Sequence, residues 1–362
     1  MFSTALRRRK CCGRLVSMKP NSAFQSINMP EGLRYSSDQM PGFTRTKRGK
    51  GFVYRQANGQ QLSDAKHIAR IQKLAIPPAY TAVWICPHPR GHIQATGRDA
   101  RGRKQYRYHA DWRLVRSETK FDRLPEFGAA LPNIRAKVKR DLITLAGAKV
   151  QRSAVLAALV RLLDTTLVRV GNDEYARSNG SFGLTTLRKR HVNIQGAQLR
   201  LRFRGKSGVQ HDVTLADPRI ARIVRRCQAL PGQELFHYVA DAGEVQSVGS
   251  MDVNAYLEAA CKDKFTAKDF RTWHGSVLAL QLWRRLEKAD QLQPTAAQAN
   301  RLLAEVASQL GNTLAVCRKS YVHPRVLALL AGEPESRKTS AKRKAGLTAS
   351  EQDFLALLAG SI

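Results

Sequence analysis

GNTLAVCRKSYVHP, residues 311–324, is the stretch of this sequence that most narrows its fold and its chemistry. It follows a run of apolar residues at helical spacing, 302–310, and Gly311 is typical of a helix end. Tyr321 therefore lies close behind helical structure. A phenol has a pKa of about 10 and is a poor nucleophile at neutral pH, so a reactive tyrosine needs cations and hydrogen-bond donors beside it. Without them, Tyr321 is an ordinary half-buried tyrosine.

Three basic residues upstream stand in well-defined contexts. Arg169 lies in the motif LVRVGN, behind an apolar run at helical spacing, and Arg271 lies in the motif KDFRT. Lys206 lies in the motif RGKSG, between two stretches in which apolar and polar residues alternate. That alternation predicts a β-hairpin with Lys206 at its tip.

These side-chain types suit the chemistry of a phosphodiester. Breaking and resealing one needs an in-line nucleophile, stabilisation of the extra negative charge, and a proton for the leaving oxygen. Arginine suits the second task because its planar fork binds two nonbridging oxygens and stays protonated. Lysine suits the third because its ammonium has protons to give and its pKa falls beside other cations. The sequence supplies two arginines, one hairpin lysine and one tyrosine for these tasks.

Net charge is the second strong signal. The chain has 362 residues, with 61 Lys plus Arg against 28 Asp plus Glu, and therefore a formal net charge of +33 and a pI near 10.6. The electrostatic field of so large a positive charge favours the binding of polyanions, of which DNA and RNA are the commonest. A ribosome-associated or membrane-surface protein would share this charge, so charge alone does not choose the partner. With 43% hydrophobic residues the chain is globular, and its length suggests two domains.

Cysteine spacing and hydropathy exclude other classes. None of the 6 cysteines has a C-x-x-C spacing and no histidine pair has a zinc-type arrangement, so reduced structural thiols of a cytoplasmic protein are expected. No apolar run approaches the roughly 20 residues that span a bilayer. The N-terminal segment before Glu31 is basic, which fits a disordered arm, an organellar transit peptide, or a start codon chosen ahead of Met29.

The periodicity changes along the chain and predicts an α+β protein. Residues 1–31 are expected to form a disordered basic arm, and residues 32–118 a small β-rich N-terminal domain. Residues 119–331 are expected to form a mainly α-helical domain with the β-hairpin, and residues 332–362 a linker and a short helix. Strands of the N-terminal domain are expected near 52–55, 82–86, 92–96 and 103–108.

Over residues 32–330 the motifs resemble those of type IB DNA topoisomerases, specifically the compact poxvirus-like and bacterial branch. The run from LVRVGNDEY through FGLTTL looks like the segment around the first catalytic arginine of that family. The resemblance implies that Arg169 and Arg271 are the two catalytic arginines. It also implies that Lys206 is the hairpin general acid and that Tyr321 is the nucleophile.

Two more catalytic positions follow from the resemblance. Lys268, in the motif KDFRT, matches a lysine that assists proton delivery. Asn312 stands nine residues before Tyr321, where the poxvirus enzymes have a histidine and bacterial relatives have a similar asparagine. Its amide can donate to a nonbridging phosphate oxygen but cannot supply a proton.

The resemblance also implies contacts with DNA. The segment 97–108 is similar to a strand of the family's N-terminal domain that lies in the major groove, and alternation puts its tyrosines on one face. Tyr and Arg suit phosphates, whereas Gln and Lys can read base edges. The alternative is a solvated basic strand with two packing tyrosines. The predicted DNA-binding residues are Arg103, Lys104, Gln105, Tyr106, Arg107, Tyr108, Tyr175 and Thr186, the last two of which equally suit structural roles.

As a whole, the resemblance implies an ATP-independent isomerase that relaxes supercoiled duplex DNA. It would nick one strand through a 3′-phosphotyrosyl intermediate, allow strand rotation and religate, with no cofactor and no metal. It would act as a monomeric C-shaped clamp on nucleoid DNA, with no membrane partner.

Two alternatives belong to other classes. A tyrosine recombinase or integrase-like strand transferase shares phosphotyrosine chemistry. Such enzymes typically carry a histidine three residues before the second arginine, where this chain has Lys268, and their DNA-binding domain is helical. A noncatalytic basic DNA-binding protein would account for the charge, but it would not need the ordered Arg, Lys, Arg and Tyr set.

Overall fold

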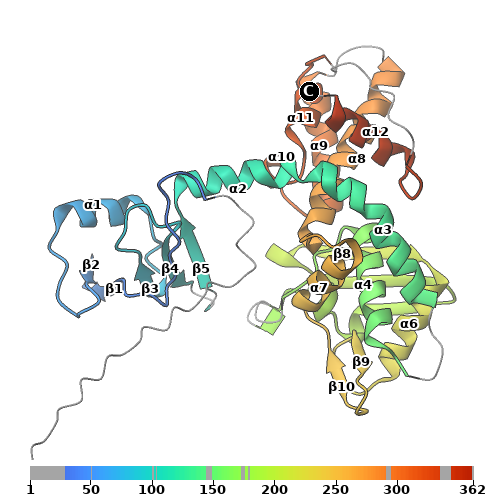
Figure 1. Cartoon of the computed structure of the whole chain (residues 1–362), viewed down its shortest axis with the longest axis horizontal. Helices are drawn as coiled ribbons and strands as arrows, with labels where there is room; N and C mark the ends of the chain where they lie inside the picture. Colours follow the sequence, from blue (N-terminus) through green and yellow to red (C-terminus); the bar gives the residue numbers. More distant parts are fainter. Residues whose placement is uncertain are drawn as a thin grey trace, which may run out of the picture.

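The structure is a computed structural model that describes residues 29–49, 51–99, 102, 104–143, 149–172, 176–177, 180–290, 295–334 and 344–360. The predicted basic arm, 1–31, lies outside these residues except for its last three. A sheet-bearing part and a larger helical part are joined by helix α2 (Ala110–Asp122) (Figure 1). No described helix combines the length and the hydropathy that crossing a bilayer requires.

The N-terminal part is an antiparallel five-stranded sheet in the order β2-β1-β3-β4-β5. Ile71 of helix α1 (Ala65–Lys73) packs with strand residues Phe43 and Ile85 in its core. The predicted β-rich region is therefore confirmed, and β1 is an additional strand. It escaped prediction because only Phe43 among its residues is buried, so no alternation marks it. The strands are β1 (Phe43–Arg48), β2 (Gly51–Arg55), β3 (Thr81–Ile85), β4 (Ile93–Arg98) and β5 (Lys104–Tyr108).

Helix α2 is anchored by aromatic residues near both ends. Trp112 is buried against Tyr35 and His92, with ring centroids 6.2 and 5.0 Å away. Phe121, near the other end, is buried in the core of the helical part. The boundary predicted between residues 118 and 119 falls inside this helix, because the change from strand to helix comes at its start.

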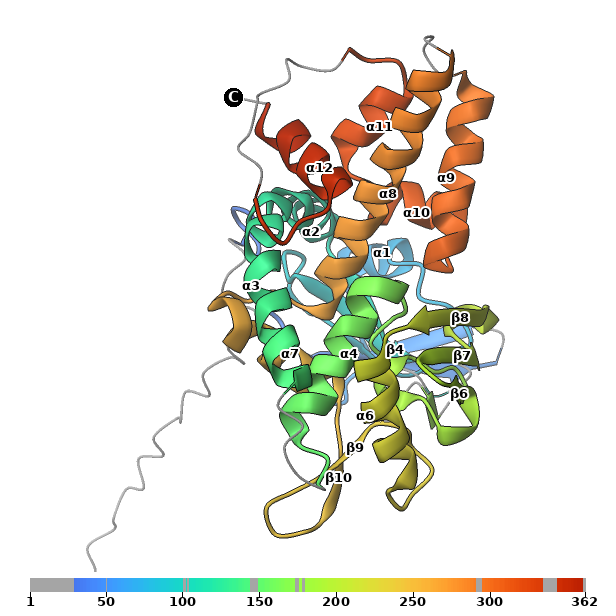
Figure 2. The ribbon, with the colours of Figure 1, turned by 90° about the vertical axis from the view of Figure 1, so that its right-hand side faces the viewer.

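Helix α4 (Arg152–Thr166) is the centre of the helical part. Its residues from Ala154 to Val160 are all buried, as is typical of a helix surrounded by others. Helices α3, α6, α7 and α8 pack around it (Figure 2). The other helices are α3 (Leu124–Ile143), α6 (Pro218–Ala229), α7 (Ser250–Cys261), α8 (Ala267–Asp290), α9 (Ala296–Leu310), α10 (Leu314–Ser320), α11 (Pro324–Leu330) and α12 (Ala349–Ala359).

Two small sheets belong to the helical part. Strands β6 (Val192–Gln195), β7 (Gln198–Arg204) and β8 (Gln210–Ala216) pair antiparallel in chain order. The β7–β8 pair is the predicted hairpin, and apolar residues of β7 are buried while the arginines between them are exposed. A further hairpin, β9 (His237–Val239) with β10 (Val245–Ser247), was not predicted.

Helix α12 packs into the core of the helical part, although the sequence prediction set residues 332–362 apart from it. Phe354 is fully buried, and its ring centroid lies 5.2 Å from that of Trp273 in α8. Thr348 and Glu351 form a capping box that begins the helix. This C-terminal helix therefore supports α8 directly.

Candidate active site

Predicted catalytic residues converge from segments far apart in the chain. Arg169 lies just past the end of α4, where Leu167 adopts a left-handed backbone with φ 58°. Arg271 lies near the start of α8, and Tyr321 is the C-cap residue of α10. The structure brings these residues together with Asn312, which follows the helix end at Gly311.

Arg271 is almost completely buried, with 3% of its surface exposed. Its Nη2 donates to the main-chain oxygen of Leu310 at 2.7 Å, and its Nη1 donates to that of Leu167. Its guanidinium carbon lies 5.0 Å from the centre of the Tyr321 ring. Burial and the charge of Arg169 lower the pKa of Arg271 to about 10. The buried Nε of Arg271 has no acceptor among the described residues.

Tyr321 has the electrostatic surroundings that a reactive phenol needs. Burial raises its pKa, but Arg271, Arg169 and Lys268 outweigh burial, so the pKa of Tyr321 lies below its ordinary value. Lys268 is exposed in the first turn of α8, three residues before Arg271. A lowered pKa increases the fraction of the nucleophilic phenolate at neutral pH.

Helix α8 also fixes the backbone of Tyr321. The Ser276 hydroxyl lies within hydrogen-bonding distance of the carbonyl oxygens of Thr272 (2.9 Å) and Tyr321 (3.1 Å), and it accepts from the N–H of His323 at 3.0 Å. A Cβ on Gly275 would lie 2.8 Å from the carbonyl oxygen of Tyr321, closer than real contacts allow. The sequence prediction missed Gly275 and Ser276. The one available signal was a glycine inside a helical pattern.

Asn312 is held in place by Arg169. Nη2 of Arg169 donates to Oδ1 of Asn312, and Nη1 and Nη2 each lie 3.4 Å from the carbonyl oxygen of Gly311. The amide Nδ2 of Asn312 is buried without an acceptor in the described part of the chain. His211 packs closely, since a Cβ on Gly311 would lie 2.8 Å from its ring. Burial and the charges of Arg169 and Arg271 lower the pKa of His211, which favours the neutral form of its ring.

Lys206 is exposed at the tip of the β7–β8 hairpin, as predicted. It begins the single turn Lys206–Gly208, in which Ser207 and Gly208 have left-handed backbones with φ 63° and 81°. The hairpin position is therefore confirmed. The role of Lys206 as the acid stays a prediction.

Strand β5 carries most of the predicted DNA contacts. Tyr106 and Tyr108 stack on one face, with ring centroids 5.8 Å apart and planes 11° apart, as the alternation predicts. Lys104 forms an ion pair with Asp38 at 2.6 Å. Within the protein, this lysine is therefore held by a carboxylate that a DNA phosphate would have to replace.

Two other side chains of β5 are also engaged by the protein. Gln105 donates to Asp99 at 3.0 Å, and Arg107 donates to the carbonyl oxygen of Ala75 at 2.9 Å. These contacts hold both side chains at the strand, and their contact with DNA stays a prediction.

Thr186 is buried, and its hydroxyl both accepts from the N–H of Gly183 at 2.9 Å and donates to its carbonyl oxygen at 3.1 Å. This bonding fits the structural alternative for Thr186. Arg103 and Tyr175 lie outside the described residues. Contact of these three residues with DNA stays a prediction.

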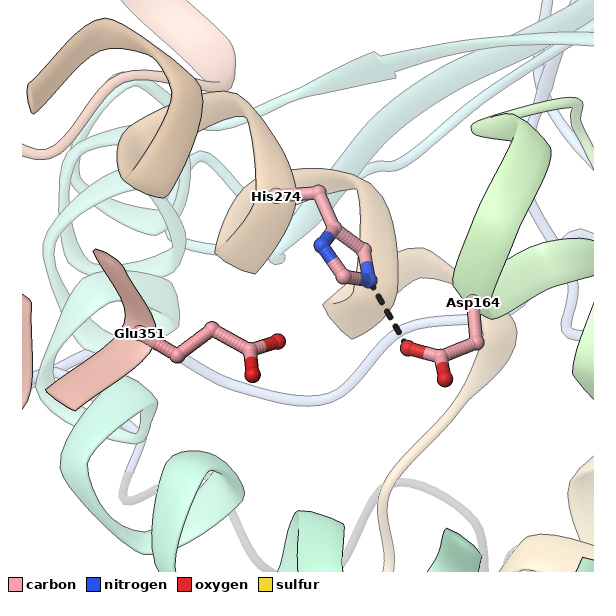
Figure 3. Close-up of side chains that lie close together, drawn as sticks. All are labelled: Asp164, His274 and Glu351. Carbon is pink, nitrogen blue, oxygen red and sulfur yellow. Dashed lines mark hydrogen bonds and ion pairs between the residues drawn. The ribbon is translucent and has the colours of Figure 1, made fainter. Parts of the chain in front are cut away.

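One group of potential metal ligands lies beside the site. Asp164 of α4, His274 of α8 and Glu351 of α12 have ligand atoms within 4.8 Å of one another (Figure 3). Arg135 of α3 already supplies the cation, since it donates to Asp164 at 2.9 Å and to Glu351 at 2.7 Å. Burial raises the pKa of Asp164, but His274 and Arg135 hold it well below its usual value. The group is an ion-pair network that supports α8.

Comparison with known proteins identifies the family. Residues 109–345 match the family described as "Eukaryotic DNA topoisomerase I, catalytic core", and residues 51–99 match "Bacterial DNA topoisomerase IB, N-terminal domain". DNA topoisomerase 1B of Acanthamoeba polyphaga mimivirus is 33% identical over 303 residues, which cover 82% of this chain and 89% of the viral protein. DNA topoisomerase I of monkeypox virus is 19% identical over 65% of this chain and 71% of its own length. The chain accordingly belongs to the type IB DNA topoisomerases, isomerases that act on DNA.

Proposed function

We propose that this topoisomerase relaxes supercoiled duplex DNA by nicking one strand through Tyr321, without ATP or metal. The observation that carries the proposal is the pair of buried donors, Nε of Arg271 and Nδ2 of Asn312, that have no acceptor in the described residues. Buried donors are ordinarily satisfied, and a nonbridging phosphate oxygen is the acceptor that suits both. Tyr321, with its lowered pKa, belongs to the same group of side chains.

Each residue of the site then has a task. The phenolate oxygen of Tyr321 attacks the phosphorus, and the bond to the 5′ oxygen breaks. Arg169 and Arg271 stabilise the extra charge on the nonbridging oxygens, aided by the amide of Asn312. Lys206, on its exposed hairpin tip, gives the leaving oxygen its proton, and Lys268 assists. The 3′-phosphotyrosyl bond conserves the energy of the phosphodiester, so resealing is the reverse reaction after strand rotation.

The two predicted domains, 32–118 and 119–331, would hold the duplex between them as a C-shaped clamp. Support comes from β5, whose stacked tyrosines and neighbouring cations offer a strand that suits a DNA groove. A net charge of +33 favours association with nucleoid DNA. The enzyme would act as a monomer, because one chain contains every residue to which the mechanism assigns a task. Membership of the topoisomerase family favours this function over the recombinase and noncatalytic alternatives.

A plasmid assay tests the proposal. The protein is expected to relax both positively and negatively supercoiled plasmid in buffer that contains EDTA and no ATP. Denaturation with detergent during the reaction is expected to trap protein on the 3′ end of a nick. Relaxation that requires ATP or magnesium, or trapping at the 5′ end, would refute the mechanism. Recombination between two DNA duplexes without relaxation would favour the strand transferase.

A further inference from the structure

The last turn of α2 contacts the chain on both sides of Tyr321. The Nζ of Lys120 donates to the carbonyl oxygen of Lys319 at 3.3 Å. The ring of Phe121 packs edge-on against that of His323, with centroids 5.3 Å apart. The helix that joins the two parts of the protein therefore touches residues two positions before and two positions after the proposed nucleophile.

Lysines from three elements gather at this contact. Lys120 comes from α2, Lys268 from the first turn of α8, and Lys319 from the last turn of α10. Burial and the charges of Lys268 and Lys319 lower the pKa of Lys120 to about 8. Because Lys268 also lowers the pKa of Tyr321, it lies within electrostatic reach of both groups.

Two carboxylates close to Lys268 in the sequence are engaged elsewhere. Asp263 pairs with Arg123 at 3.1 Å, and Asp269 accepts from the backbone N–H of Thr266 at 2.7 Å. Within the residues that the structure describes, none of the three lysines forms an ion pair. Like charges that gather without a counter-charge destabilise the protein alone, and a polyanion that binds among them removes that cost.

We propose that Lys120, Lys268 and Lys319 form a subsite for a second backbone phosphate of DNA, adjacent to the scissile one. The inference rests on the proposed function, since it takes Tyr321 as the point of cleavage. An ammonium group binds a phosphate as a point charge. When it turns to the phosphate, Lys120 gives up a long, 3.3 Å bond to a carbonyl and a cation–π contact with the Phe121 ring, whose centroid lies 4.3 Å from Nζ. Holding the strand beside the nucleophile keeps the scissile phosphorus in line.

The test combines charge removal on the protein with charge removal on the DNA. A duplex that carries the mapped cleavage site is made with a neutral methylphosphonate at one flanking phosphate at a time. The rate of covalent complex formation is measured in single turnover for the wild type, Lys120→Met and Lys120→Arg. Arg113→Met is the matched control, because Arg113 is an exposed cation on α2 seven residues before Lys120 and has no part in the site.

On unmodified DNA, Lys120→Met is expected to lower the rate about 10- to 100-fold, the range for a charged hydrogen bond, and Lys120→Arg to retain most of it. At one flanking position the methylphosphonate should slow the wild type by a similar factor and slow Lys120→Met no further. Arg113→Met should respond to the methylphosphonate at that position as the wild type does.

Additive effects of Lys120→Met and the methylphosphonate at every position would overturn the subsite. Lys319→Met repeats the test on an exposed side chain of α10, in case Lys120→Met disturbs folding. Tyr321→Phe separates the two proposals. A covalent complex in that variant would refute the proposed function, whereas its absence together with fully additive lysine effects would refute only the subsite.

Discussion

Arg169 donates to Oδ1 of Asn312, a residue 143 positions away, and so orients its side-chain amide. With Oδ1 occupied, the amide has only its Nδ2 donor to offer to a phosphate. We therefore expect Asn312→Ala to slow cleavage about 10- to 100-fold. Asn312→Asp should be slower still, because its carboxylate keeps the contact with Arg169 but repels the phosphate. Single-turnover cleavage rates of the two variants measure this order, and an aspartate variant faster than the alanine variant would contradict it.

Tyr321→Phe removes the oxygen that is proposed to attack and keeps the ring beside Arg271. We expect it to abolish both relaxation and covalent trapping, with DNA affinity unchanged in a binding titration. Tyr238→Phe is the control, because the Tyr238 hydroxyl is bonded to Gln246 on the β9–β10 hairpin. That variant should keep its activity.

A substrate with a different leaving group can distinguish the role of Lys206 from that of the two arginines. Removing either kind of cation should cost about 10²–10³ in rate, so rate alone does not distinguish them. A substrate with sulfur in place of the 5′ bridging oxygen releases a thiolate, which needs no proton. It should restore cleavage by Lys206→Ala but not by Arg169→Ala or Arg271→Ala. If this substrate restored cleavage by the arginine variants but not by Lys206→Ala, Lys206 would not be the general acid.

Gly275 is expected to control the position of the nucleophile. A methyl group there would come within 2.8 Å of the carbonyl oxygen of Tyr321, so the nucleophile segment must shift. Gly275→Ala should lower the cleavage rate at least tenfold while DNA affinity is kept, since small displacements of reacting groups cost large factors in rate. Crowding should also cost about 1–3 kcal/mol in the free energy of unfolding. An unchanged cleavage rate would show that the segment adapts freely.

Glu351→Gln should reveal the contribution of the buried ion-pair network to stability. Burial raises the pKa of Glu351, but Arg135 and hydrogen bonds outweigh it and hold that pKa below 4.5. A carboxyl whose pKa is lowered on folding stabilises the protein above its unfolded pKa, and this stabilisation is lost as pH falls through the folded pKa. The variant should lose about 1–3 kcal/mol at pH 7, with the difference in Tm shrinking below pH 4.

A matched control for Glu351 lies on the same helix. Asp353 pairs with Arg284 at 2.9 Å, but its side chain is 39% exposed. Asp353→Asn should therefore cost less than about 1 kcal/mol. A Glu351→Gln difference in Tm that stays constant from pH 7 to pH 3 would show that its charge contributes nothing.

Local patterns were enough to predict the parts of this site that have a local signature. Hairpin alternation placed Lys206 at a tip, and the helix end at Gly311 placed Tyr321 behind a helix. Contacts between distant segments have no comparable pattern in the local sequence. Ser276 meets the carbonyl oxygen of Tyr321 across 45 residues, and Arg135 meets Glu351 across 216 residues. A serine or a glutamate looks the same in sequence whether or not a distant partner buries it.

The ion-pair network under α8 also sets an order of events during synthesis. Glu351 follows Tyr321 by 30 residues, so the ribosome makes every predicted catalytic residue before the network can close. At roughly 5–20 residues per second this interval lasts about 1.5–6 s. A nascent chain in that interval has the proposed nucleophile, while Arg135 lacks one of its two carboxylate partners and Trp273 lacks the Phe354 ring that packs against it. The contacts that hold α8 from the C-terminal side are thus completed last, after every predicted catalytic residue has been made.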